Sequence, residues 1–341
     1  MRSHEFITET ITIVNYQEQF EKVIVASIKV ALINLANAER AIKQIEHEAE
    51  VIQSILPLLF THLKVFYTLL RDELKLNVWD VFSNLFTNRY SNDRLLLRRP
   101  RSFSFRSNMT ANGSATGLSI TLNERMITEI SAVVSNFIKQ EYKQNVNTKN
   151  AGSIADHFYK IVSDIANRPK IILEDPTLQQ IIHKWANTMT HELVHVFQHA
   201  EQYKKKRINT EYRSYAEKDP AKFQTAVRRL TTPDDYKIYR ASPQEITAFA
   251  HNIASQILKN TKFRSKILWG DLDQSNYSKI ISDYVAEHLK YTPEQRKNMN
   301  YIERKVFNRY VKQVYQILQH YVETEQEKFY SNYKFNRGFN E

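Results

Sequence analysis

The chain has 341 residues, enough for two or three domains, and its 42% hydrophobic and 12% aromatic residues are typical of a globular protein. It contains no Cys, which excludes disulfides, thiolate metal sites and cysteine nucleophiles, so any metal must be bound by His and carboxylate side chains. No apolar run approaches the length of a membrane span, and the N-terminus lacks the layout of a secretion signal. We therefore expect no membrane partner. The location stays unknown from the sequence; the chain has no recognisable secretion signal, which is compatible with a cytoplasmic or virion-associated protein.

The positive charge is unevenly distributed along the chain. The net charge is +11, with six Arg against one Asp between Arg89 and Arg106, and 11 basic against five acidic residues between Tyr203 and Arg240. Each cluster is interpreted either as a solvated face or as a binding surface for nucleic acid or another acidic partner.

Residues 1–95 are predicted to form a helical arm. Apolar residues recur at alternating steps of four and three, a heptad seam, at Ile24, Ile28, Ala31, Leu35, Ala38, Ile42, Ile45, Ala49 and Ile52. The same register continues across Pro57 at Leu56, Leu59, Leu63, Phe66 and Leu70. This predicts a kinked helix or two helices stacked end to end. Either the seam packs inside its own domain, or residues 24–70 form a coiled-coil contact with a second copy of the chain or a partner helix.

The segment 101–123 is the best candidate for a β-hairpin. Apolar residues alternate with polar ones on both sides of the loop 111–117, at Phe103, Phe105, Leu118, Ile120 and Leu122. Helical patterns follow at 124–144 and 153–167, and residues 168–175 are predicted to form a short strand. The expected fold is therefore α+β and predominantly α-helical.

A long helix is predicted next, with Asp175 as its N-cap and Pro176 in its first turn, ending near Lys204. It contains the sequence HELVH at residues 191–195. Residues four apart share a helix face, so His191 and His195 can bind one metal ion, and Glu192 can act as a general base on a metal-bound water. The opposite face is apolar at Ile181, Trp185, Met189, Leu193, Val196, Ala200 and Tyr203. We therefore expect the His and Glu side chains to face a cleft or solvent.

The HELVH motif resembles that of the zincins, a superfamily of zinc metallopeptidases. The resemblance implies a zincin-like centre within residues 96–262, in which a small antiparallel sheet lies with the motif helix and Zn²⁺ is the cofactor. The metzincin branch continues with a Gly and a third His, and this chain has Gln198 and Glu201 in those places. The chain is more similar to the gluzincin branch, which takes its third ligand, a Glu, from a second helix.

Residues 242–254 look like that second helix. By the resemblance, Glu245 is the third metal ligand, and the small residue Ala248 would let the two helices approach. Phe249 stands where a thermolysin-like enzyme has an Asp. The alternative is that Ser242 and Glu245 form a capping box at the start of this helix. The reserve ligands are Asp234 and Asp235.

A zinc peptidase also needs a donor for the oxyanion of its tetrahedral intermediate. Tyr239 is the first choice among the residues near Glu245 that could serve, which are Tyr236, Tyr239, Arg240 and His251. His199 lies one turn beyond His195 and is expected near the cleft without binding the metal. His183 is expected at the surface.

Residues 263–341 are predicted to form a helical C-terminal region. Its apolar stripes are Ile280, Ile281, Tyr284 and Val285, then Ile302, Val306, Tyr310, Val314, Leu318 and Tyr321. The tail 329–341 is aromatic and polar without a period, which is typical of a docking strap or a disordered segment.

The leading hypothesis is a zinc metalloendopeptidase that binds a peptide or protein substrate along the hairpin edge by strand addition. The alternative is a structural or assembly protein, such as a component of a virus particle or an intracellular complex. In that case the metal site is vestigial or stabilises the fold.

Overall fold

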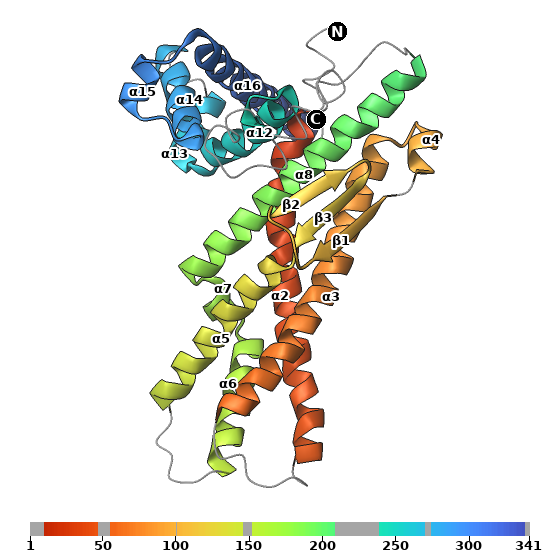
Figure 1. Cartoon of the computed structure of the whole chain (residues 1–341), viewed down its shortest axis with the longest axis vertical. Helices are drawn as coiled ribbons and strands as arrows, with labels where there is room; N and C mark the ends of the chain where they lie inside the picture. The colour runs from red at the N-terminus through yellow and green to blue at the C-terminus, as the bar shows by residue number, and fades with distance from the viewer. Residues whose placement is uncertain are drawn as a thin grey trace. The chain divides into compact units, whose positions relative to one another are not determined.

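The computed structural model describes residues 10–46, 55–99, 101–145, 152–208, 239–269 and 274–337. This part of the chain is predominantly α-helical with one small sheet, which confirms the expected helix-rich α+β class (Figure 1). The longer helices are α2 (Thr10–Glu46), α3 (Ile55–Arg89), α5 (Arg125–Asn145), α6 (Gly152–Asn167), α8 (Pro176–Ile208), α12 (Pro243–Lys259), α13 (Thr261–Trp269), α14 (Gln274–Leu289) and α16 (Tyr301–Arg337). The short helices are α4 (Arg94–Leu97), α7 (Lys170–Leu173) and α15 (Pro293–Lys297).

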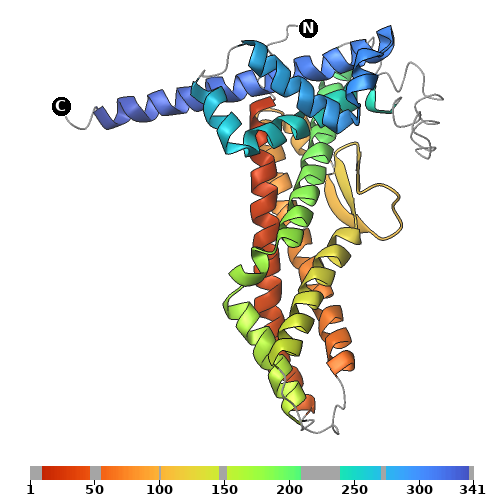
Figure 2. The ribbon, with the colours of Figure 1, turned by 90° about the vertical axis from the view of Figure 1, so that its left-hand side faces the viewer.

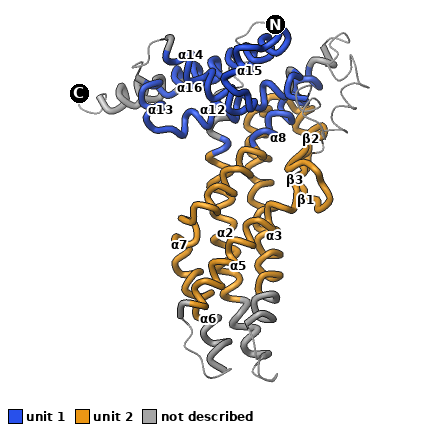
Figure 3. Tube along the Cα trace, turned by 60° about the vertical axis from the view of Figure 1, so that its left-hand side comes forward, with its two compact units in different colours: residues 1–17, 190–341 blue, residues 18–189 orange. Residues whose placement is uncertain are grey.

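The chain divides into two compact units (Figure 3). Unit 2 comprises residues 18–189, and unit 1 comprises residues 1–17 together with 190–341. The sequence suggested divisions after residues 95 and 262, whereas the units divide inside α2 and α8. Each of these long helices therefore supplies residues to both units. The sheet therefore belongs to unit 2, and the HELVH motif belongs to unit 1.

In unit 2, α3 runs back alongside α2 (Figures 1 and 2). The Asn77 amide of α3 donates a hydrogen bond to Ser27 Oγ of α2 at 3.0 Å. The prediction of a kinked helix or of two helices stacked end to end is therefore wrong. Pro57 lies in the first turn of α3, where its missing N–H costs no helical hydrogen bond.

The described part of the heptad seam packs inside the chain. Its buried members are Ile24, Ile28, Ala31, Leu35, Phe66 and Leu70. The side chains of the seam positions from Ala38 to Leu59 lie outside the described residues. Because these six positions are buried, they are not available to a second copy of the chain or to a partner helix, whereas Leu63 is half-buried.

The sheet of unit 2 has mixed pairing. Its strands are β1 (Ser102–Arg106), β2 (Gly113–Thr116) and β3 (Ser119–Asn123), in the order β1-β3-β2. β1 runs parallel to β3, and β2 runs antiparallel to it. The predicted antiparallel hairpin is therefore wrong, because its supposed loop contains β2. The true hairpin joins β2 to β3 and turns at Gly117, whose φ of 59° favours glycine.

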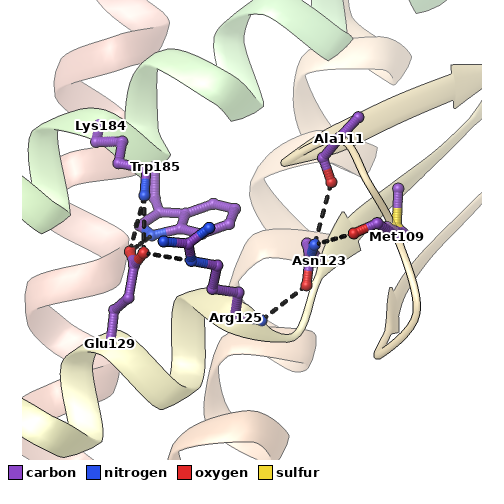
Figure 4. Close-up of polar contacts among 7 residues, drawn as sticks. All are labelled: Met109, Ala111, Asn123, Arg125, Glu129, Lys184 and Trp185. Carbon is purple, nitrogen blue, oxygen red and sulfur yellow. Dashed lines mark hydrogen bonds and ion pairs between the residues drawn. The ribbon is translucent and has the colours of Figure 1, made fainter. Parts of the chain in front are cut away.

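Polar contacts fix the start of α5 after the sheet (Figure 4). The Asn123 side chain donates to the carbonyls of Met109 and Ala111 at 2.8 and 3.2 Å, and its Oδ1 accepts from Arg125 N at 3.0 Å.

A second set of polar contacts joins α5 to α8. The Glu129 carboxylate of α5 accepts from Lys184 Nζ and from the indole of the fully buried Trp185, each at 2.9 Å, and it pairs with Arg125 Nε at 2.9 Å (Figure 4). Burial alone would raise the pKa of Glu129, but the hydrogen bonds from Lys184 and Trp185 and the neighbouring cations lower it. These contacts hold α5 against the part of α8 that belongs to unit 2.

The helical predictions for 124–144 and 153–167 are confirmed as α5 and α6. The predicted strand at 168–175 is wrong, because that segment forms the helical turn α7 with Ile172 and Leu173 buried. A short apolar run has no period that distinguishes a strand from a buried helical turn. The predicted start of the motif helix is confirmed, since Asp175 Oδ1 accepts from Leu178 N at 2.9 Å.

Helices α12, α13, α14 and α16 share a hydrophobic core in unit 1. The predicted stripes contribute Ile281, Val285, Tyr310, Val314, Leu318 and Tyr321 to it. Of the other predicted positions, Tyr284 and Val306 pack half-buried against this core, Ile280 is half-buried, and Ile302 is 71% exposed in the first turn of α16. The tail was predicted to be a docking strap or a disordered segment. The backbone of α16 is helical to Arg337, so the second alternative is wrong as far as that residue, and the docking strap stays a prediction. Among the described helices, none combines the length and the apolar character that crossing a membrane requires.

Candidate metal centre

Three side chains of unit 1 converge on one point. His191 and His195 come from α8, and Glu245 comes from the first turn of α12. The two His Nε2 atoms lie 3.1 Å apart, and each lies 3.2 Å from one oxygen of the Glu245 carboxylate. The fold thus brings together the three residues that the sequence analysis selected as metal ligands.

The spacing of these atoms fits a tetrahedral metal ion. At zinc–ligand distances of about 2.1 Å, the corners of a tetrahedron lie about 3.4 Å apart. The observed separations of 3.1 and 3.2 Å are slightly shorter. Two imidazole nitrogens and a carboxylate are also a ligand set that zinc accepts. The residues present therefore fit the cofactor that the motif implies.

The start of α12 holds Glu245 in place. Ser242 is the N-cap, and its Oγ accepts from Glu245 N at 3.4 Å. The backbone N–H of Ser242 donates to the Tyr239 carbonyl at 3.1 Å, so it does not require the Glu245 carboxylate. Only the Ser half of the capping box is observed, and the carboxylate faces the two imidazoles. Ala248, one turn further on, is fully buried, as the close approach of the helix requires.

Gln198 orients one of the two imidazoles. His195 Nδ1 lies 3.0 Å from Gln198 Oε1. Because an amide oxygen can only accept, Nδ1 carries a proton in either charge state of the ring, and Nε2 faces the ligand cluster. In the sequence, Gln198 is only a departure from the metzincin pattern. Its spacing of three residues from His195 was the signal that it shares a helix face with this ligand.

Replacing Gln198 with Ala should weaken zinc binding by about tenfold to a hundredfold, the usual cost of losing a group that orients a metal-ligating His. A competition titration against a chromophoric chelator would measure the change. Unchanged affinity would mean that Gln198 does not orient His195.

The HELVH face is buried, contrary to the prediction that it looks into a cleft or solvent. His191, Glu192 and Glu245 are 7%, 6% and 5% exposed. The physical reason is that the start of α12 covers this face, while the apolar stripe on the other side of α8 is also covered. The apolar stripe of α8 shows one packed face of the helix, and its period does not reveal that the opposite face is packed as well.

An aromatic cluster packs beside the ligands. The Phe249 ring lies 4.6 Å from the His191 ring and 5.0 Å from the ring of His288, which comes from α14. The guanidinium of Arg240 lies 5.7 Å from the Phe249 ring and donates to the His288 carbonyl at 3.2 Å. Phe249 thus packs against the ring of the ligand His191. Among the described residues, Nδ1 of His191 has no hydrogen-bond partner. His288 was missed because no motif or spacing links residue 288 to the HELVH helix.

Tyr239 lies beside the third ligand, as its selection as oxyanion donor requires. Burial raises the pKa of its hydroxyl, and so do the charge of Glu245 and a hydrogen bond to that carboxylate. The charge of Glu192 raises it further, which places this carboxylate within electrostatic range of Tyr239. The hydroxyl therefore keeps its proton at neutral pH.

The other residues considered have different places. Tyr236, Asp234 and Asp235 lie outside the described residues. His251 is buried on α12, and His199 is not part of the ligand cluster. His183, which was predicted to lie at the surface, belongs to unit 2 and is half-buried. Its Nδ1 lies 2.9 Å from Glu21 Oε1.

Electrostatics couple His195 to Glu245. Burial alone would lower the pKa of His195, but the hydrogen bond and charge of Glu245 and the charge of Glu192 raise it to about 9. Burial alone would raise the pKa of Glu245, but hydrogen bonds from the two imidazoles lower it to about 2. In the metal-free protein at neutral pH, His195 is therefore protonated and Glu245 is ionised.

Zinc must displace the proton on Nε2 of His195, so the affinity of the protein for zinc should rise with pH. His195 is protonated below a pKa of about 9, and we expect about a tenfold gain in apparent affinity per unit between pH 6 and 8. Calorimetric titrations in two buffers of different ionisation enthalpy would count the released protons. Zinc binding without proton release in this range would contradict the assignment of the proton to His195.

The chain matches no protein-family model, no curated protein and no solved structure. The resemblance to the zincins therefore depends on the HELVH motif and on the geometry of the ligand cluster.

Proposed function

We propose that the protein is a zinc metallopeptidase of the HExxH type. The observation that supports this most directly is the position of Glu245. A carboxylate 50 residues beyond His195 in the chain, on a separate helix, meets both HELVH imidazoles at 3.2 Å. A His-Glu-x-x-His pattern that binds no metal would not need a carboxylate from a second helix beside both imidazoles.

His191, His195 and Glu245 would hold the zinc ion. When bound, the ion would act as a Lewis acid and make a water molecule acidic enough to attack a peptide carbonyl at neutral pH. Glu192 is the group that accepts the proton of the attacking water, since it follows the first ligand directly and its charge acts on the ligand cluster. Tyr239 keeps its proton, and its hydroxyl, which is hydrogen-bonded to the Glu245 carboxylate in this structure, would turn to donate a hydrogen bond to the oxyanion.

Burial of the ligands favours a second candidate, a metal site that serves stability in a structural or assembly protein. Structural zinc sites are closed, whereas catalytic sites keep a position open for water and substrate. With His191 at 7% and Glu192 at 6% exposure, a substrate could reach the centre only after a local rearrangement. The two candidates share the metal and differ in whether Glu192 has a chemical role.

Peptide hydrolysis separates the two candidates. The zinc-loaded protein should cleave members of a peptide library, a chelator should stop the cleavage, and added zinc should restore it, as mass spectrometry of the products would show. A protein that holds one zinc per chain and cleaves nothing would leave the structural candidate. The predicted binding of substrate by strand addition stays a prediction, since the sheet belongs to unit 2 and the ligands to unit 1.

A further inference from the structure

A cavity of about 490 Å³ lies within unit 2, between α3 and the start of β1. These two elements pack side by side (Figure 1). The volume is within the range of sites that bind small molecules, about 300 to 1,000 Å³. The HELVH centre contributes no residue to this cavity.

One wall of the cavity is a face of α3 formed by Asp72, Lys75, Leu76 and Trp79, at helical spacings of three and four. Leu76 is 61% exposed, although it is a large apolar residue, and the half-buried Trp79 ring lies one turn away from it. Phe103 of β1 supplies a further apolar surface. An apolar ligand group would find an aliphatic and two aromatic side chains here.

Arg101, the residue before β1, places a cation in the cavity wall. Its Nη2 donates to Ser83 Oγ and Thr87 Oγ1 at 3.2 and 3.0 Å, and its guanidinium lies 5.0 Å from the Phe86 ring. These contacts hold the guanidinium in a fixed orientation, but both acceptors are neutral.

Within the described residues, no carboxylate forms an ion pair with Arg101, and its Nη1 is buried without an acceptor. Burial lowers the pKa of Arg101, as expected for a cation without a compensating anion, but it stays charged at neutral pH. Lys75 adds a second positive charge to the wall against the single negative charge of Asp72. The cavity therefore has an excess of positive charge beside an apolar surface.

We propose that this cavity binds a small amphipathic carboxylate, with its anionic group near Arg101 and its aromatic or branched apolar group against Leu76, Trp79 and Phe103. A carboxylate provides the single negative charge that the wall lacks, and a guanidinium binds it through charge-assisted hydrogen bonds. The apolar lining favours such a ligand over an inorganic anion. The same chemistry occurs in a free acid and in the C-terminal residue of a peptide.

Calorimetric titration with N-acetyl-L-phenylalanine and with its neutral amide tests the proposal. The acid should bind at least about tenfold more tightly than the amide, the scale of a charge-assisted hydrogen bond. Arg101→Gln should abolish this preference. Arg168→Gln is the matched control, because Arg168 is exposed and lines a different cavity of unit 2, and it should keep the preference.

Leu76→Glu keeps the test valid if the Arg101 variant does not fold. The substitution is at an exposed position, so the fold should persist, as circular dichroism would show. The added negative charge should weaken binding of the acid by about tenfold and leave binding of the amide unchanged. Equal affinity for acid and amide, or equal binding of inorganic phosphate, would overturn the proposal. Tighter binding of N-acetyl-Gly-Gly-Gly-Phe than of the free acid would identify a peptide terminus as the source, and weaker binding would identify a small acid; both support the carboxylate.

Discussion

Glu245→Gln should lower the affinity for zinc by more than about a hundredfold, because loss of a ligand costs more than loss of an orienting group. The variant keeps the size of the side chain and removes the charge that faces His191 and His195 at 3.2 Å. Competition with a chromophoric chelator measures the affinity, and elemental analysis of the purified protein measures the stoichiometry. The expected values are one zinc per wild-type chain and almost none in the variant.

Ser242→Ala is the control that separates the two roles first considered for Glu245. Ser242 Oγ accepts from Glu245 N, so its loss removes the helix cap and should lower the free energy of unfolding by about 1 kcal/mol. Zinc affinity should stay within a few-fold of the wild type, because the carboxylate is unchanged. A Glu245→Gln protein that binds zinc as tightly as the wild type would exclude Glu245 as a ligand.

Glu192→Gln should retain zinc and lose at least about a hundredfold in peptide hydrolysis, the usual scale for removing a general base. Gln has nearly the same shape as Glu but cannot accept the proton of the attacking water. The measurement is the rate of product formation from a cleaved library peptide, with zinc content determined on the same samples. A fully active variant would remove Glu192 from the mechanism.

Glu201→Gln is a matched substitution on the same helix. Glu201 pairs with Lys204 at 3.8 Å and lies outside the ligand cluster. This variant should hydrolyse peptides at the wild-type rate. An equal loss in both variants would show that the change on α8 perturbs the helix and does not report on the chemistry.

Local sequence signals predicted most of the helices. Asp175 caps α8 as expected, because N-caps depend on residues next to one another in the chain. The sheet was mispredicted because alternation shows which residues share a face and not which strands pair. The parallel pairing of β1 with β3 requires a crossover that no local pattern encodes.

The candidate ligands were accessible from the sequence because HELVH fixes two of them on one helix face. Glu245 could be selected only through the resemblance to a family, since the helix that carries it begins far along the chain. The packing of Phe249 and His288 beside His191 could not be predicted, because it depends on how α12 and α14 pack in unit 1. Burial of Glu192 was missed for the same reason: one stripe does not reveal a second neighbour.

The contact of the HELVH helix with Glu245 also bears on how stable unit 1 is against opening. An ion shared by α8 and α12 would act as a crosslink that closes a loop of roughly 50 residues, from His195 to Glu245. By the chain-entropy relation for crosslinks, closing such a loop restricts the unfolded chain by on the order of 4 kcal/mol. Metal supply would then govern how often unit 1 opens, so zinc availability could set the lifetime of the folded chain even where no bond is cleaved.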